Sequence, residues 1–459
     1  MSSFVRESLL TFGSRILLVL VNLPVSILIF RHLGADGQSI YSSATSYATS
    51  CVVIGLLGVD AAHTYYLAGG RWRGPQIVGN SLVVLALLSL ILIPLFPPLI
   101  AFATRGEGDA LHPFLRVASL MIPILGARYL LLSVFMARRR NETFNLIYAA
   151  ADLLLLGLLL VGFLAFGAGA TWALWAFIAS QAVMVLVAGR WVGQREVRGV
   201  GPPRPSKQLL ASSLSYGLRG CLASVLTTFV YRFDTVLVLR WLGTAAQGQY
   251  FVAVFLAEKL THITASVQAV LFPHISAASG EEANRLTPRV CRHTLFWVVA
   301  AAAVLFVLAG ILLRTFYSDK AAACIAPMRI LLPGVAALTV SKLLTADLSG
   351  RDRRFLPTLF MGMALGVNIL LNIAWTRRLG IAGAAWASTA AYTLQAGLIM
   401  VYFWRVTGVS PARLFVPQPG DVEAYRALAR RWRDRAARAR EAGDRGGPPP
   451  AGPPPEEIR

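Results

Sequence analysis

Charged residues are scarce in this sequence. Only 14% of the 459 residues are Asp, Glu, Lys or Arg, whereas an ordinary soluble domain has about 25%. Hydrophobic residues make up 56%. This balance excludes a soluble globular enzyme and a disordered protein, and it indicates a protein that crosses a membrane many times.

Residues that bind metals are few and widely spaced. The four cysteines (Cys51, Cys221, Cys291 and Cys324) include no CxxC pair, and the six histidines form no HExxH motif. Zinc sites need such ligands at short spacing. We therefore expect buried, unreactive cysteines, no bound metal and no cofactor.

Long apolar runs, bounded by glycine, proline or charge clusters, dominate the chain. A membrane helix needs about 20 mostly apolar residues, and no run alternates as the strands of a membrane barrel would. The first run has no cleavage site after it, so we interpret it as a retained span. The expected fold is all-α, with twelve transmembrane helices at 9–31, 39–67, 76–103, 114–137, 144–167, 170–192, 208–239, 246–273, 291–316, 325–347, 355–376 and 381–405.

Basic residues are unevenly shared between the connections. Lys and Arg outnumber Asp and Glu by 43 to 22, a net charge of +21. Alternate connections, starting at the N-terminus, hold 17 Lys and Arg before the tail, and the other connections hold 7. The positive-inside rule places the richer set, and with it both termini, in the cytoplasm. We expect a multi-pass protein of the inner (plasma) membrane.

Two segments 209 residues apart carry the same pattern. Residues 31–34 and 240–243 both read Arg-x-Leu-Gly, and Tyr41 and Tyr250 follow seven residues after each glycine. Upstream, Gly13-Ser14-Arg15 resembles Gly217-Leu218-Arg219. Each half has an even number of spans, so both face the same way, as in a parallel repeat. We predict an N-terminal six-helix lobe (1–192), a cytoplasmic linker (193–207), a C-terminal six-helix lobe (208–405) and a cytoplasmic tail (406–459).

Charged residues inside the spans are more basic than acidic. Such groups cost several kcal/mol unless they are paired or hydrated. Some should pair, either Arg232 with Asp234 or Glu258 with a basic group on a neighbouring span. The surplus indicates an anionic partner, and the planar fork of arginine matches phosphate oxygens. The basic residues are Arg15, Arg128, Arg219, Arg232, Lys259, Arg329 and Lys342, and the acidic ones are Asp60, Asp152, Asp234 and Glu258.

Four ionisable residues on the polar spans are candidates for ion coupling. Asp60 and His63 are three residues apart on one helix face, and histidine titrates near neutral pH. A plain hydrogen bond between these two is the alternative interpretation. Asp234 and Glu258, on the seventh and eighth spans, complete the set.

An ordered set of short motifs on the twelve spans resembles the Wzx-like polysaccharide flippases of the multidrug/oligosaccharidyl-lipid/polysaccharide exporter superfamily. The resemblance covers roughly residues 3–405. Its motifs are Arg31-x-Leu33-Gly34-x6-Tyr41, Gly55-Leu56-Leu57-Gly58-Val59-Asp60, Tyr65-Tyr66-Leu67-Ala68, Arg232-x-Asp234, Arg240-x-Leu242-Gly243-x6-Tyr250, Phe272-Pro273-x-Ile275-Ser276 and Gly380-Ile381-x-Gly383-Ala384-Ala385.

The resemblance implies a V-shaped fold of two lobes around a cationic cavity that opens alternately to the two membrane faces. It implies a polyprenyl-pyrophosphate-linked oligosaccharide as cargo and other polysaccharide assembly proteins as partners. On this basis Arg15, Arg219 and Lys259 are candidates for pyrophosphate contacts. Arg128, Asn22 and Tyr216, from the buried charges and polar helix faces, complete the candidate cargo-binding set.

Other functions remain open at this point. A drug or metabolite exporter of the same superfamily would need acidic groups for cationic drugs. A lipid II flippase of peptidoglycan synthesis would carry a fuller N-terminal arginine set. A glycan polymerase or ligase needs a catalytic external loop, and the longest external connection has only about 10 residues without an acid or histidine cluster. We therefore expect a transporter and no enzyme.

The tail carries a basic amphipathic pattern. After Asp421, a possible helix cap, apolar residues recur at three- and four-residue steps among seven arginines up to about residue 442. Such a helix binds anionic lipid at the inner leaflet, and a solvated or partner-binding helix is the alternative. The Pro/Gly-rich end from Gly443 is expected to be disordered. We expect no nucleic-acid partner.

Overall fold

The computed structural model describes residues 2–353, 355–416 and 418, with the backbone alone for residues 2–20 and Asn141. All regular structure within these residues is helical. The tail helix expected at about 421–442 and the Pro/Gly-rich end lie outside the described residues.

The helices follow one another without long loops. They are α1 (Ser2–Gly55), α2 (Val59–Ala68), α3 (Gly74–Ala103), η1 (Asp109–Phe114), α4 (Leu115–Ser119), α5 (Met121–Ala137), α6 (Asn141–Phe166), α7 (Ala170–Val192), η2 (Gly193–Val197), α8 (Lys207–Glu258), α9 (Thr261–Ala277), α10 (Gly280–Leu312), η3 (Leu313–Tyr317), η4 (Asp319–Cys324), α11 (Ile325–Gly350), α12 (Phe355–Leu379), α13 (Ile381–Thr407) and α14 (Ala412–Phe415).

These helices make the twelve passes expected from the sequence. Seven helices in the described residues are long and apolar enough to span a membrane. Two more spans are bent pairs, α1–α2 at 57° and η1/α4–α5 at 55°. The long helices α1 and α8 each hold two passes joined across a kink, which adds one pass for each, and α13, with 27 residues, is the twelfth. The chain is therefore a multi-pass membrane protein.

The two kinks lie at the glycines of the internal repeat. Gly34 has φ 70° and ψ −168°, and Gly243 has φ 82° and ψ −179°. Residues with a Cβ atom scarcely populate this region of the backbone map. The six-residue helices η1 and η4, each before the fourth span of its half, also start 210 residues apart, at Asp109 and Asp319. Both landmarks confirm the parallel repeat.

A prediction follows for the kink glycines. Alanine at Gly34 would meet no atom within 4 Å, so its cost is that of the backbone conformation, about 1–3 kcal/mol. We expect Gly34→Ala and Gly243→Ala each to lower the thermal unfolding midpoint in detergent. The control is Gly366→Ala in α12, which is helical and also meets open space, and which should leave the midpoint unchanged or raise it. Equal midpoints in all three variants would contradict the proposed role of the kinks.

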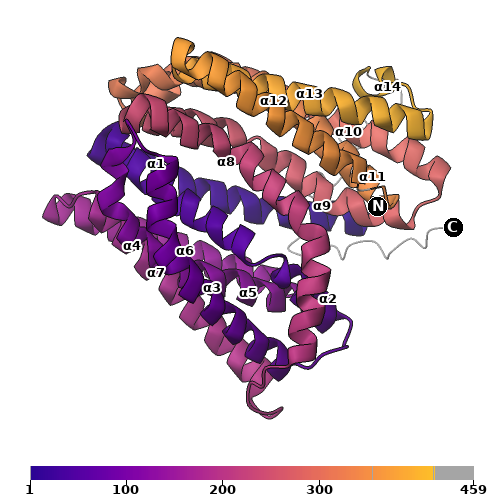
Figure 1. Cartoon of the computed structure of the whole chain (residues 1–459). Helices are drawn as coiled ribbons and strands as arrows, with labels where there is room; N and C mark the ends of the chain where they lie inside the picture. The colour runs from indigo at the N-terminus through magenta and orange to yellow at the C-terminus, as the bar shows by residue number, and fades with distance from the viewer. Residues whose placement is uncertain (1, 354, 417, 419–459) are drawn as a thin grey trace, which may run out of the picture.

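The helices form two groups (Figure 1). In this view α3 to α7, in violet and magenta, lie below α10 to α13, in salmon to yellow, and α1 and α8 run between them. Each group has its own apolar core. Tyr47, Leu88 and Leu125 belong to the first-half core, and Leu343, Ile399 and Phe403 to the second-half core.

The ends of the passes near Gly34 and Gly243, called here the kink end, join the two halves by reciprocal contacts. Arg31 Nη2 donates to the Thr315 carbonyl at 2.9 Å, and Arg240 Nη1 donates to the Ala103 carbonyl at 3.3 Å. Because Arg31 and Arg240 are repeat equivalents, each half caps the end of a helix of the other half. A hydrogen bond of 2.5 Å from Thr244 Oγ1 to Asp36 Oδ1 adds to the contact. The positive-inside rule predicts that this end faces away from the cytoplasm.

The opposite end, called here the linker end, carries residues 193–206. This segment packs against α3, since Ser206 N donates to Asn80 Oδ1 at 2.7 Å and Arg204 N donates to the Pro75 carbonyl at 3.2 Å. The first turns of α8 then lie on the first half. A Cβ atom at Gly217 would come within 2.3 Å of the Leu57 carbonyl, so glycine is required there for the backbones to touch.

Candidate functional site

Polar residues near the middle of three helices form a cluster inside the first half. Arg128, Asp152 and Gln181 lie close to the midpoints of α5, α6 and α7. Arg128 Nη1 donates to Gln181 Oε1 at 3.1 Å and to the Tyr148 hydroxyl at 3.2 Å. Asn22 Nδ2 donates to Asp152 Oδ2 at 3.0 Å. We call these five residues the first-half cluster.

A second cluster lies where the eighth pass is broken between α8 and α9. Glu258 and Lys259 stand at this break. Glu258 Oε2 is 3.8 Å from Arg232 Nη1. Lys259 Nζ lies 3.8 Å from the centre of the Phe255 ring, and Lys342 Nζ lies 5.4 Å from that of Tyr231. The charged members, Arg232, Glu258, Lys259 and Lys342, are called the second-half cluster.

The two clusters lie within electrostatic range of each other, although they belong to different halves. Asp152 lies within electrostatic range of both Arg128 and Lys259, so a carboxylate of α6 connects cations from the two halves. Among the described residues, Arg128, Arg232 and Lys259 are three cations against the two carboxylates Asp152 and Glu258. Over the part of the chain that the structure describes, the two clusters therefore carry more positive than negative charge, at a depth where charge is costly to bury.

Arg232 pairs with Glu258, and the alternative pairing with Asp234 is wrong. Asp234 is 3% exposed and accepts hydrogen bonds from the Tyr250 hydroxyl at 2.6 Å and the Ser388 hydroxyl at 2.9 Å. Neighbouring residues on a helix point about 100° apart, so residues 232 and 234 lie on nearly opposite faces. Asp234 thus joins α8 to α13 inside the second half. As an ion-coupling residue it stays an untested prediction.

Asp60 and His63 are on α2, but the hydrogen bond considered between them is not formed. His63 is fully buried, and its Nδ1 lies 3.2 Å from the Ser81 hydroxyl of α3. Asp60 is half-buried one turn earlier. The structure therefore assigns His63 to the packing of α2 on α3. The ion-coupling role predicted for this pair stays untested.

The remaining candidates lie nearer the linker end. Arg219 and Tyr216 are exposed on the first half of α8, and Tyr216 stacks on Tyr65 with ring centres 4.9 Å apart. Arg15 is in the part of α1 whose side chains are not described. Arg15 precedes its kink glycine by 19 residues and Arg219 precedes its own by 24. The two spacings differ by five residues, which corresponds to a rotation of about 140° beyond one full helical turn. The two arginines therefore lie on different faces of the repeated helix and are not repeat equivalents.

Sequence reasoning missed Tyr148 and Gln181 as parts of the site. Both lie on spans that look plain in the sequence, and Gln181 is the one Asn or Gln residue within 170–192. A lone buried amide near a helix midpoint is a usable signal, because a buried polar group needs a partner. Arg329 donates from Nε to the Phe306 carbonyl at 2.9 Å and contacts α10, outside both clusters. In the described residues, no three His, Cys, Asp or Glu side chains gather as metal ligands would.

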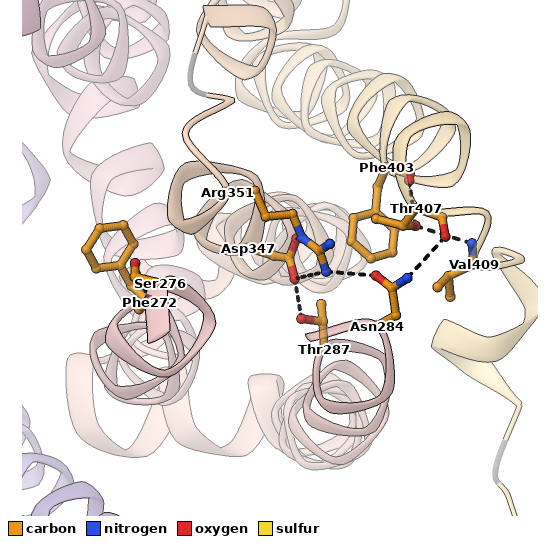
Figure 2. A network of polar contacts seen from close by, with 9 residues as sticks. All are labelled: Phe272, Ser276, Asn284, Thr287, Asp347, Arg351, Phe403, Thr407 and Val409. Carbon is orange, nitrogen blue, oxygen red and sulfur yellow. Dashed lines mark hydrogen bonds and ion pairs between the residues drawn. The ribbon is translucent and has the colours of Figure 1, made fainter. Parts of the chain in front are cut away.

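A separate polar network ties together the linker ends of α10, α11 and α13 (Figure 2). Arg351 Nε donates to the buried Asp347 Oδ1 at 2.6 Å, and Arg351 Nη2 donates to Asn284 Oδ1 at 2.9 Å. Thr287 donates to Asp347 Oδ2 at 2.5 Å, and Asn284 Nδ2 donates to the Thr407 carbonyl at 3.3 Å. The network thus fixes the ends of the fourth and sixth passes of the second half.

The first half has a comparable tie at the same end. Arg138, just after α5, donates from Nε and Nη2 to Glu196 of η2 at 2.7 and 2.6 Å. This bidentate bond to the Glu196 carboxylate raises the pKa of the Arg138 guanidinium. In both halves, therefore, an arginine after the fourth pass links that pass to another element at the linker end, so each half is held together there.

We expect Thr287→Val to destabilise the protein by about 1.5–3 kcal/mol, because the hydrogen bond it removes ends on a buried charged group. The control is Thr393→Val in α13, whose hydroxyl donates only to the Thr389 carbonyl of its own helix. The measurement is the thermal unfolding midpoint in detergent. A midpoint for Thr287→Val equal to that of the control would show that the network contributes little.

Comparisons with known proteins agree with this architecture. A model of the family described as polysaccharide biosynthesis protein matches residues 78–326, more than half of the chain. No curated protein matches the chain significantly.

Solved structures share the fold. The chain is similar to an inward-facing conformation of a multidrug resistance MATE family transporter of the MOP superfamily, with 15% identity over 85% of this chain and 94% of that one, TM-score 0.69. It is similar to the lipid II flippase MurJ in an inward closed conformation, with 15% identity over 88% and 90%, TM-score 0.69. It is also similar to an outward-facing conformation of a multidrug resistance MATE family transporter, with 15% identity over 88% of this chain and 95% of that one and a TM-score of 0.59.

These findings confirm the all-α, two-lobed fold of twelve passes. The family match covers the third to ninth passes, and the solved structures cover most of the chain. The chain belongs to the family described as polysaccharide biosynthesis protein.

Proposed function

We propose that the protein moves a polyprenyl-pyrophosphate-linked oligosaccharide across the inner membrane for the assembly of a cell-surface polysaccharide such as O-antigen, capsule or exopolysaccharide. The observation that carries the proposal is the surplus of positive charge among the described residues of the two clusters near mid-membrane. A pyrophosphate group carries the negative charge that this surplus requires.

The geometry of the clusters suits a pyrophosphate. Arg128 and Arg232 offer planar forks that bind oxyanions with two parallel hydrogen bonds. Lys259 stands on the broken eighth pass, and discontinuous helices near the bilayer midplane are typical binding sites in transporters. Asp152, within range of Arg128 and Lys259, would hold the two cations in place until cargo displaces it.

We propose alternating access as the mechanism. The kink end is closed by the reciprocal bonds of Arg31 and Arg240, so cargo would enter from the linker end, which the positive-inside rule assigns to the cytoplasm together with both termini. Release would require these bonds to break. Entry at the linker end and release at the kink end involve no covalent chemistry, so the proposal includes no enzymatic step.

Coupling to a cation gradient is part of the proposal. Of the four predicted coupling residues, Glu258 is the best placed, since one carboxylate oxygen pairs with Arg232 and the other is buried without a hydrogen-bond partner among the described residues. Protonation of Glu258 would free Arg232 for the cargo. Reversible uptake of a proton at such a site links ion binding to cargo binding.

Lipid analysis after deletion of the gene in the native host tests the function. The proposal predicts that a lipid-linked oligosaccharide accumulates on the cytoplasmic side of the membrane and that the wild-type gene reverses this accumulation. Loss of resistance to cationic drugs with unchanged glycolipids would favour a drug exporter instead. Accumulation of a peptidoglycan precursor would identify a different lipid-linked cargo.

A further inference from the structure

A basic pocket of about 420 Å³ lies at the kink end, away from the two clusters. Residues of both halves line it. Arg105 and Glu107 come from the connection after α3, Arg240 and Trp241 from α8, and Arg377 from the end of α12. The pocket therefore spans the boundary between the halves, beside the bond from Arg240 to the Ala103 carbonyl.

Each of the three arginines is held in place by a contact that leaves N–H donors available. Arg377 stacks on Trp241 with its guanidinium carbon 4.7 Å from the ring centre. Arg105 stacks on Phe102 at 5.5 Å, and Arg240 uses Nη1 for the Ala103 carbonyl. A guanidinium has five N–H donors, so each of the three arginines still has N–H groups that can donate to an oxyanion.

The charge of the pocket is unbalanced. Three arginines and the single carboxylate of Glu107 leave two positive charges. Among the described residues, no carboxylate lies within 4.0 Å of any of the three guanidinium groups. The connections at this end hold only 7 Lys and Arg outside the spans, and three of them meet here. The positive-inside rule disfavours basic residues at this end, so their convergence needs another cause.

We propose that this pocket binds a phosphate or pyrophosphate group, as the headgroup of a lipid, at the membrane face opposite to the cytoplasm. Bidentate bonds from arginine forks suit phosphate oxygens, and Trp241 and Leu242 provide an apolar wall for the adjoining carbons. Because both halves contribute arginines, the ligand binds best while the kink end keeps its present geometry. The pocket is a site separate from the two clusters and does not depend on them.

Residue-resolved arginine labelling tests the proposal. Purified full-length protein in detergent is treated with phenylglyoxal, and the labelling rate of each arginine is measured by mass spectrometry. The probes are inorganic pyrophosphate, geranyl pyrophosphate and dihexanoyl phosphatidylglycerol, with dihexanoyl phosphatidylcholine as the zwitterionic comparison. At a probe concentration ten times Kd, mass action predicts about tenfold slower labelling of Arg105 and Arg377. Arg378, the exposed neighbour of Arg377 that does not line the pocket, should label at an unchanged rate.

Matched variants identify the site and the ligand. Arg377→Gln should abolish the protection of Arg105, whereas Arg378→Gln should preserve it. Protection by all three anionic probes would show that the pocket binds any phosphate oxyanion. Protection by geranyl pyrophosphate alone would identify a prenyl pyrophosphate as the ligand, and protection by phosphatidylglycerol alone would identify a membrane phospholipid. Unchanged labelling of Arg105 and Arg377 with every probe, or equal protection of Arg378, would overturn the proposal. None of these outcomes bears on the clusters, so the proposed function is tested separately.

Discussion

Lys259→Gln is expected to lower the transport rate of a pyrophosphate-linked lipid by about 10- to 100-fold. Lys259 stands at the break between α8 and α9, within electrostatic range of Asp152 of the other half. A hydrogen bond to a charged group contributes about 1.5–3 kcal/mol, and each 1.4 kcal/mol is about tenfold. The loss should appear in transport by vesicles that contain equal amounts of inserted protein.

The matched control for this substitution is Lys320→Gln in η4, which removes the same charge from an exposed position. Its transport rate should equal that of the wild type. Lys259→Arg, which keeps the charge, should recover part of the lost rate. Transport at the wild-type rate by the Lys259→Gln variant would show that the second-half cluster does not bind the cargo.

Locking the kink end is expected to stop transport almost completely. Cysteines placed at Asp36 and Thr244, whose side chains now share a hydrogen bond of 2.5 Å across the halves, can be joined by a short bis-methanethiosulfonate reagent. Alternating access requires these residues to separate, so the crosslinked protein should lose nearly all transport. A reducing agent should restore it. The four native cysteines are first replaced by alanine or serine.

Two controls separate locking from damage. Each single cysteine variant with the reagent should transport as it does without the reagent. The pair Arg138→Cys and Glu196→Cys, which replaces an ion pair of longer side chains inside the first half, should tolerate crosslinking by a longer reagent of the same type. Transport that continues while the bond between residues 36 and 244 is intact would contradict alternating access by separation at this end.

The sequence predicted the passes and the repeat well because both depend on local properties. Apolar runs of membrane length and the spacing of Arg-x-Leu-Gly are visible without tertiary contacts. The glycines of that motif adopt a backbone conformation that other residues avoid, which explains why they stand out in both halves. The all-α fold follows because helices satisfy their own backbone groups in lipid.

The broken passes were harder to predict. The break between α1 and α2 follows Gly55 and includes Gly58, with φ 75°, so glycine gave a local signal. The break at Glu258 and Lys259 has no glycine or proline, and only tertiary packing reveals it. Such a break is also where two charged residues enter the membrane interior.

The pairing of buried charges could not be read from sequence spacing. Arg232 and Asp234 are two residues apart, but the helix directs one toward Glu258 and the other toward Tyr250 and Ser388. The first-half cluster joins α1, α5, α6 and α7, whose relative placement no local pattern specifies. Residue type predicted which groups need partners, while the partners themselves depend on the packing of distant helices.

Reconstitution measures the central claim most directly. Purified protein is placed in liposomes that contain a polyprenyl-pyrophosphate-linked oligosaccharide with an NBD label, and dithionite added outside reduces every label that reaches the outer leaflet. The account predicts more complete reduction than in protein-free vesicles, about 10- to 100-fold slower protein-dependent reduction for Lys259→Gln, and no effect on NBD-phosphatidylcholine. Reduction of the labelled oligosaccharide lipid that is no greater than in protein-free vesicles would contradict the account.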